Sequence, residues 1–191
     1  MKLNNLAVAC IFSLTTVSLS AATLEGQSFQ DGIKLGSSEL RLNGLGLRAV
    51  LFIKGYVAGL YLNEKGSTLQ EISAMLGPKR LQLRMLRGAG PDDFNSALVS
   101  GLRENASVAE LAALNRRITE LERLIAATGT TVKGDVINFD YVPGLGTTLT
   151  VNGVSQGKAI AGADFYNAVL SIFVGDHPVD ERLKKGLLGQ L

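Results

Sequence analysis

Apolar and polar residues alternate along several stretches of the chain, and this period-two pattern predicts β-strands. Leu81, Leu83 and Met85 share one face of an extended segment, and the polar residues between them share the other face. Such a strand is typically half-buried in its sheet. Asn152-Gly153 follows another apolar stretch and is a strong signal for a hairpin turn. The expected strands lie at residues 23–42, as a starting hairpin, and at residues 79–87, 135–142 and 147–151.

The longest apolar segment beyond the N-terminus covers residues 45–62 and is interrupted by Gly46, Gly55 and Gly59. Its β-branched and aromatic residues favour extended structure, and glycines inside a strand often mark bulges or bends. The pattern therefore predicts either a buried, bent pair of strands or one long strand with bulges.

Apolar residues at three- and four-residue spacing predict the helices. The clearest case is residues 107–127, where Leu111, Leu114, Ile118 and Leu121 fall on one face. The expected helices cover residues 68–76, 91–105, 107–127 and 162–174, and a last helix starts near Asp180. Strands and helices in this order predict one α+β domain in which a helical layer covers a sheet.

The N-terminus has the pattern of a secretory signal peptide. Lys2 precedes an apolar run over residues 6–19, and Ser20-Ala21-Ala22 supply a small-residue cleavage site. The run is shorter than the roughly 20 residues of a spanning helix, which argues against a membrane anchor. We therefore expect residues 1–22 to be a signal peptide and residues 23–191 to form the mature domain. That domain would be periplasmic or secreted, without stable membrane insertion after cleavage.

Charge and composition argue against several classes of function. The formal net charge is only +2 and the basic residues are not clustered, so no nucleic-acid partner is expected. Cys10 is the only cysteine and falls in the expected signal peptide, and His177, in a turn, is the only histidine. With so few ligands of the usual types, we expect no metal site and no cofactor. A Ser-His-Asp triad could use only His177, and no nucleophile-elbow motif accompanies it.

Four polar residues within the apolar segment are unusual: Arg48, Lys54, Tyr56 and Tyr61. A buried guanidinium needs a negative partner, and either a protein carboxylate or a ligand could supply one. Eight residues of extended chain span about 26 Å. Arg48 and Tyr56 can therefore meet at one small group only if a turn or bulge folds the chain between them.

The segments 42–48 (Leu-Asn-Gly-Leu-Gly-Leu-Arg), 52–62 and 169–180, with Leu183-Lys184 after the last, resemble the chalcone isomerase superfamily. The resemblance is closest to the bacterial, exported chalcone isomerase-like branch, and it covers nearly all of the mature chain in order. It implies an open-faced β-sandwich, in which a large curved antiparallel sheet is backed by helices. It also implies a ligand cleft between the sheet and the helical layer.

The resemblance retains little of the isomerase's polar site. Arg48 matches the arginine that helps to polarise the nucleophilic oxygen of the chalcone, but Tyr56 replaces the active-site threonine. Phe94 replaces a water-holding tyrosine, Gly101 an asparagine, and Ile172 a hydroxyl residue. Losing one donor to a developing oxyanion typically costs about 10²–10³ in rate. We therefore do not expect true chalcone isomerase activity.

Another branch of the superfamily, plant plastid proteins that bind fatty acids, holds a carboxylate with an arginine and a tyrosine. Arg48 and Tyr56 resemble that pair, and a guanidinium with a phenol suits a carboxylate. The resemblance implies a small amphipathic carboxylate, such as a fatty acid, as the partner. An intramolecular lyase or isomerase with an unknown substrate, and a non-catalytic partner protein, are the alternatives. The expected ligand-binding residues are Arg48, Tyr56, Lys54 and Phe94, and the expected apolar lining is Leu51, Phe52, Leu83, Met85, Phe94, Leu98, Val169 and Ile172.

Overall fold

A computed structural model of the protein describes residues 21–191. The expected signal peptide, residues 1–22, lies almost entirely outside the described residues. Its last two positions, Ala21 and Ala22, begin a short strand and pair with Gln30 and Phe29. This hairpin consists of β1 (Ala21–Leu24) and β2 (Gln27–Gln30) and forms a small two-stranded sheet of its own.

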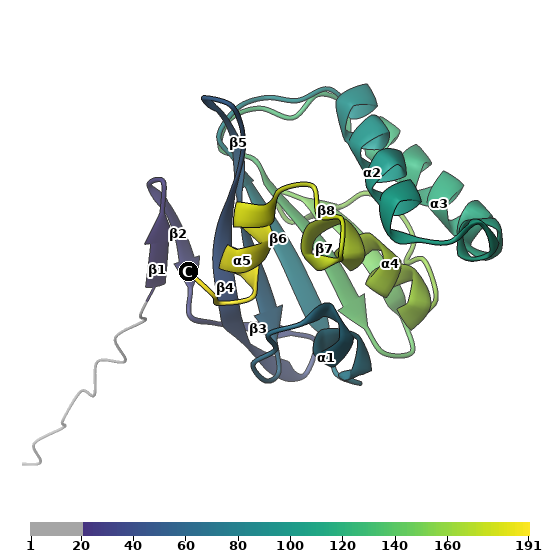
Figure 1. Ribbon diagram of the computed structural model, residues 1–191, viewed down its shortest axis with the longest axis horizontal. Helices are drawn as coiled ribbons and strands as arrows, with labels where there is room; N and C mark the ends of the chain where they lie inside the picture. Colours follow the sequence, from purple (N-terminus) through teal and green to yellow (C-terminus); the bar gives the residue numbers. More distant parts are fainter. Residues whose placement is uncertain (1–20) are drawn as a thin grey trace, which may run out of the picture.

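The main sheet is antiparallel, and its seven strands follow one another in chain order from β3 to β9. Figure 1 shows it as a strongly curled sheet with helices gathered on one side. Short turns join some neighbouring strands, and segments that contain helices join the others. The strands are β3 (Gly32–Leu35), β4 (Ser38–Val50), β5 (Ile53–Leu62), β6 (Lys79–Met85), β7 (Val136–Val142), β8 (Gly146–Val151) and β9 (Val154–Ser155).

The apolar segment 45–62 is a pair of strands, which decides between the two alternatives that the sequence left open. β4 and β5 form a hairpin that turns at Leu51 and Phe52. The register shifts between Leu42 and Gly44 and again between Arg48 and Ala49. Such bulges bend a strand and increase its twist, which contributes to the curl of the sheet.

The helices lie where the sequence predicted them, within one or two residues at each end. Side-chain caps fix several starts: Thr68 accepts a hydrogen bond from Glu71 N, and Ser107 forms a reciprocal capping box with Glu110. Asp180 caps the last helix by accepting a hydrogen bond from Leu183 N. The helices are α1 (Leu69–Ala74), α2 (Pro91–Asn105), α3 (Val108–Thr128), α4 (Ala163–Val174) and α5 (Glu181–Leu187). Within residues 21–191, no helix has both the length and the hydrophobicity that crossing a membrane requires.

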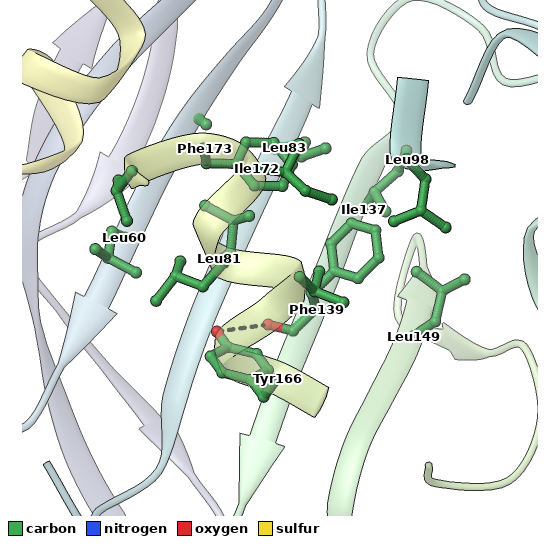
Figure 2. Packing of buried hydrophobic residues seen from close by; sticks show 14 of the residues in the cluster. Leu60, Leu81, Leu83, Leu98, Ile137, Phe139, Leu149, Tyr166, Ile172 and Phe173 are labelled. Carbon is green, nitrogen blue, oxygen red and sulfur yellow. Dashed lines mark hydrogen bonds between the residues drawn. The ribbon is translucent and has the colours of Figure 1, made fainter. Parts of the chain in front are cut away.

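The main core lies between the sheet and the helices. Figure 2 shows leucines of β5 and β6 packed against Ile172 and Phe173 of α4, with Leu98 of α2 beside them. The Tyr166 hydroxyl donates a hydrogen bond of 3.3 Å to the Phe139 carbonyl. A second cluster lies on the other face, where Phe29 of the β1–β2 hairpin packs against residues of β4 and β5. The expected α+β fold, a curved antiparallel sheet with a helical layer, is confirmed.

The last helix, α5, packs directly on β4. Gly44 and Gly46 face α5, and Gly186 faces β4, so backbone meets backbone. A Cβ atom at Gly186 would overlap the Leu45 carbonyl, and one at Gly46 would overlap the Leu183 carbonyl. This contact brings the N-terminal end of α5, with Asp180, to the part of β4 that carries Arg48.

Candidate functional site

An apolar cavity lies between the sheet and the helices, and it holds about 70 Å³ of water-accessible space. Phe94 and Leu98 of α2, Ile172 of α4, Leu83 of β6 and Phe139 of β7 are among its lining residues. Figure 2 shows Leu83, Leu98, Phe139 and Ile172 together at this place. Of the lining residues, only Tyr56 has a polar side chain. The cavity is therefore suited to hydrocarbon, with one hydroxyl for orientation.

Most of the residues that were expected to line the cavity do line it or lie in the core beside it, but the expectation was wrong for two residues. Leu83, Phe94, Leu98, Val169 and Ile172 do line the cavity, and Met85 is buried in the core. Leu51 and Phe52 do not reach it. They form the β4–β5 turn, where they are 89% and 98% exposed. Their apolar character suggested burial, but the hairpin places them at its outer end.

Arg48 and Tyr56 lie directly opposite each other on β4 and β5. The sequence predicted that the two residues could meet only if a turn or bulge lay between them, and the β4–β5 turn brings them together. Side chains of directly opposed residues on antiparallel strands are neighbours on one face. Removal from water raises the pKa of Tyr56, the Arg48 guanidinium opposes this shift, and the Asp180 carboxylate adds to it. The tyrosine is therefore a protonated donor at neutral pH.

Asp180 is the protein carboxylate beside Arg48. Arg48 Nη1 lies 3.4 Å from Asp180 Oδ2, and it also donates a 3.0 Å hydrogen bond to the Ala49 carbonyl. The Asp180 carboxylate also accepts hydrogen bonds from the backbone nitrogens of Ala49, at 3.4 Å, and Leu183, at 2.9 Å. The two side chains keep 24% and 15% of their exposure. Sequence reasoning missed Asp180 because it lies 132 positions from Arg48.

A second arginine shows what a fully engaged ion pair looks like in this protein. Arg80 donates to both oxygens of Asp140, through Nε at 2.6 Å and Nη2 at 2.5 Å. Arg48, in contrast, contacts its carboxylate partner Asp180 through a single nitrogen, at 3.4 Å. Its Nε and Nη2 form no hydrogen bond within residues 21–191. Arg48 can therefore still donate to a further acceptor, whereas the fork of Arg80 is already occupied.

Of the four expected ligand-binding residues, the structure gathers three near the cavity and separates the fourth. Tyr56 and Phe94 line it, and Arg48 stands opposite Tyr56. Lys54 instead forms an ion pair with Glu25, in the turn of the β1–β2 hairpin, with 2.6 Å between Nζ and Oε2. Its ammonium group is thus held by the hairpin on the other face of the sheet.

Other chemistry that the sequence raised has little geometric support in the described residues. His177 is exposed in the turn between α4 and α5, where its backbone carbonyl accepts a 2.7 Å hydrogen bond from Asn105. Gly101 of α2 lies against Ile172 of α4 in tight apolar contact. Residues 21–191 contain no group of three or more His, Cys, Asp or Glu side chains that could hold a metal ion.

The chain is similar to known proteins in its sequence and in its fold. Residues 21–189 match the model of a family described as chalcone isomerase-like. The fold is similar to that of a fatty-acid binding protein of Arabidopsis thaliana, with a TM-score of 0.65 and 15% sequence identity. That similarity covers 88% of this chain and 96% of the plant chain. No curated protein sequence matches the chain.

Proposed function

Because this chain belongs to the chalcone isomerase-like family, we propose that it binds a small amphipathic carboxylate, such as a fatty acid, between its sheet and its helices. The observation that carries the proposal is the pairing of Arg48 with Tyr56 beside a cavity whose other lining residues are all apolar. The fold that it shares with a protein described as fatty-acid binding adds support. We also propose that it works as a member of the exported, bacterial branch.

The chemistry of the pair suits a carboxylate better than a neutral group. A guanidinium forms charge-assisted hydrogen bonds to carboxylate oxygens, and the unengaged Nε and Nη2 of Arg48 are available for them. The protonated Tyr56 hydroxyl supplies a further donor, because its pKa is raised. The hydrocarbon tail would extend past Phe94 and Ile172 into the cavity.

The cavity has to widen to hold such a ligand. Sites for small molecules usually have a volume of about 300–1,000 Å³, whereas this cavity holds about 70 Å³. One wall is the sheet, and the helices α2 and α4, with Ile125 of α3, form most of the remaining lining. We propose that α2 moves outward when the tail enters, because the sheet is held by its hydrogen-bonded ladder.

Asp180 provides a sharp test, because its charge has opposite effects on two partners. It holds Arg48 in place, but it repels a ligand carboxylate. Arg48→Ala should lower the affinity for dodecanoate by about 1.5–3 kcal/mol, the contribution of a hydrogen bond to a charged group. Asp180→Asn should raise the affinity, since asparagine retains the helix cap without the negative charge. Isothermal titration of the purified protein measures both effects.

The controls separate a role in binding from a role in folding. Arg116→Ala removes an exposed arginine on α3 and should leave the affinity unchanged, and dodecanol, which lacks the carboxylate, should not respond to Arg48→Ala. The Arg48–Asp180 pair is partly exposed, so its loss should cost at most about 1 kcal/mol of stability. A variant Arg48→Ala that binds dodecanoate normally but unfolds early would assign Arg48 to the fold alone.

Isomerase chemistry has less support from the same geometry. The cavity offers Tyr56 as its single polar side chain, and acid–base catalysis needs groups positioned at the reacting atoms. A purely non-catalytic partner role would leave the pairing of Arg48 and Tyr56 at the cavity without a purpose.

A further inference from the structure

The end of the β4–β5 hairpin carries four consecutive exposed apolar residues, which we call the β4–β5 tip. Their exposures are 54% for Val50, 89% for Leu51, 98% for Phe52 and 54% for Ile53. Figure 1 shows this tip projecting from one end of the sheet, with α1 at the opposite end. Scattered exposed apolar residues are ordinary on a protein surface, but a contiguous group marks an interaction site.

The turn also departs from the turn chemistry that the chain uses elsewhere. Leu51 has φ +53°, in the left-handed region that favours glycine and asparagine. The β1–β2 turn uses Glu25-Gly26 and the β8–β9 turn uses Asn152-Gly153, each with positive φ at both residues. Among the turns of residues 21–191, the β4–β5 turn alone combines a leucine at positive φ with an exposed phenylalanine. Two unfavourable features at one place, with no compensating internal contact, indicate a function outside the folded chain.

The shape of the tip favours a lipid bilayer over a protein partner. Val50 and Ile53 are paired across the hairpin and share one face, and Leu51 and Phe52 form the turn beyond them, so the apolar surface is a narrow end and not a broad flat face. A stable protein interface takes roughly 800 Å² from each partner. Four side chains expose less than this, because an aromatic ring buries about 150–250 Å² and two of the four residues are half-covered. Hydrocarbon can cover all sides of so narrow a tip.

The two charged residues nearest to the tip in sequence are already paired. Lys54 is bound to Glu25, and Arg48 is bound to Asp180. The tip itself, residues 50–53, carries no charged side chain, so burial of apolar surface has to drive binding. Interfacial binding of this kind scales with the apolar area buried at the headgroup boundary.

We propose that the β4–β5 tip inserts reversibly into the surface of a lipid bilayer, with Leu51 and Phe52 in the acyl boundary. This contact is peripheral and differs from a stably inserted segment. It does not depend on the fatty-acid site, although it would place Arg48, two residues from Val50, on the membrane side of the protein.

The chain contains no tryptophan, so a single introduced tryptophan can report on the tip. The variant Phe52→Trp should show blue-shifted emission with phosphatidylcholine vesicles and strong quenching when the lipids are brominated. The matched control is Leu76→Trp, because Leu76 is also 89% exposed but follows α1 at the other end of the sheet. Its emission should change little. Equal shifts in both variants would indicate adsorption through another part of the chain and would overturn the proposal.

A double variant tests the apolar residues themselves. The double variant Leu51→Gly with Phe52→Asn places glycine at the one turn position that has positive φ, so the fold should be retained or stabilised, as thermal unfolding would show. Vesicle partitioning should fall by at least about tenfold, because two large side chains no longer bury their surface. Three results would overturn the proposal: unchanged partitioning, binding that requires anionic lipid and is lost in salt, or self-association without vesicles that the double variant abolishes.

Discussion

The contact between Gly101 and Ile172 closes off a part of the cavity wall where, by the resemblance, a chalcone isomerase carries polar groups. A Cβ atom at Gly101 would lie 2.6 Å from Ile172 Cγ2, so no longer side chain fits there without movement. Phe94 adds another apolar group to the same lining. Gly101, Ile172 and Phe94 therefore supply no donor that could stabilise a developing oxyanion.

At this scale we predict that the protein does not cyclise chalcones. Spectrophotometric loss of a hydroxychalcone should not exceed the uncatalysed rate, while an authentic chalcone isomerase in the same assay serves as the positive control. A turnover within the range of about 1–10³ s⁻¹ that is typical of enzymes would show that Tyr56, Phe94, Gly101 and Ile172 do not determine the outcome.

Individual residues also show where sequence reasoning stops. The need of Arg48 for a negative partner followed from its apolar surroundings, but the identity of Asp180 depends on how α5 docks on β4. Leu51 and Phe52 looked like cavity residues because composition does not reveal which apolar residues form a turn. Lys54 was expected to bind the ligand, but its ion pair with Glu25 depends on where the β1–β2 hairpin packs.

At the scale of elements, the helices were the most predictable, because caps and apolar spacing mark both ends locally. The segment 45–62 was harder, since its turn has neither glycine nor proline and its apolar pattern runs through the bend. The order of the strands in the sheet followed chain order, but the sequence could not supply the register. The bulge between Arg48 and Ala49, which keeps Arg48 opposite Tyr56, was therefore visible only in the structure.

The contact of α5 with β4 predicts that alanine at Gly186 lowers the stability of the protein, although alanine has the higher helix propensity. Gly186→Ala should favour an isolated helix by about 1 kcal/mol. In the protein it should instead destabilise the fold by about 1–3 kcal/mol, because the added methyl group overpacks the contact with Leu45. Chemical denaturation measures the change. Gly32→Ala is the control, since its Cβ atom would lie at an ordinary 3.7 Å from the Leu40 carbonyl. Equal stability of both variants would contradict the close packing.

At the scale of the whole molecule, we predict that the mature chain is shorter than the gene product. N-terminal sequencing of exported protein should begin at or within a few residues of Thr23. Placing an arginine in the apolar run, as in Val8→Arg, should block export by interrupting the hydrophobic region. Soluble cytoplasmic protein that retains Met1 in the unaltered chain would refute the prediction. Cleavage before Thr23 would leave two of the four β1–β2 residue pairs, Thr23 with Ser28 and Leu24 with Gln27.

The packing of the last helix on an early strand also determines when the fold can be completed during synthesis. Asn43 of β4 donates a 2.8 Å hydrogen bond to the carbonyl of Leu187, 144 positions later in the chain. Until α5 has left the ribosome, Asn43 lacks this partner and the glycine face of β4 is uncovered. Because domains generally fold as units during synthesis, the nascent protein stays incomplete until α5 has emerged. A chain that closes only with its last helix would remain open to threading through a translocation channel.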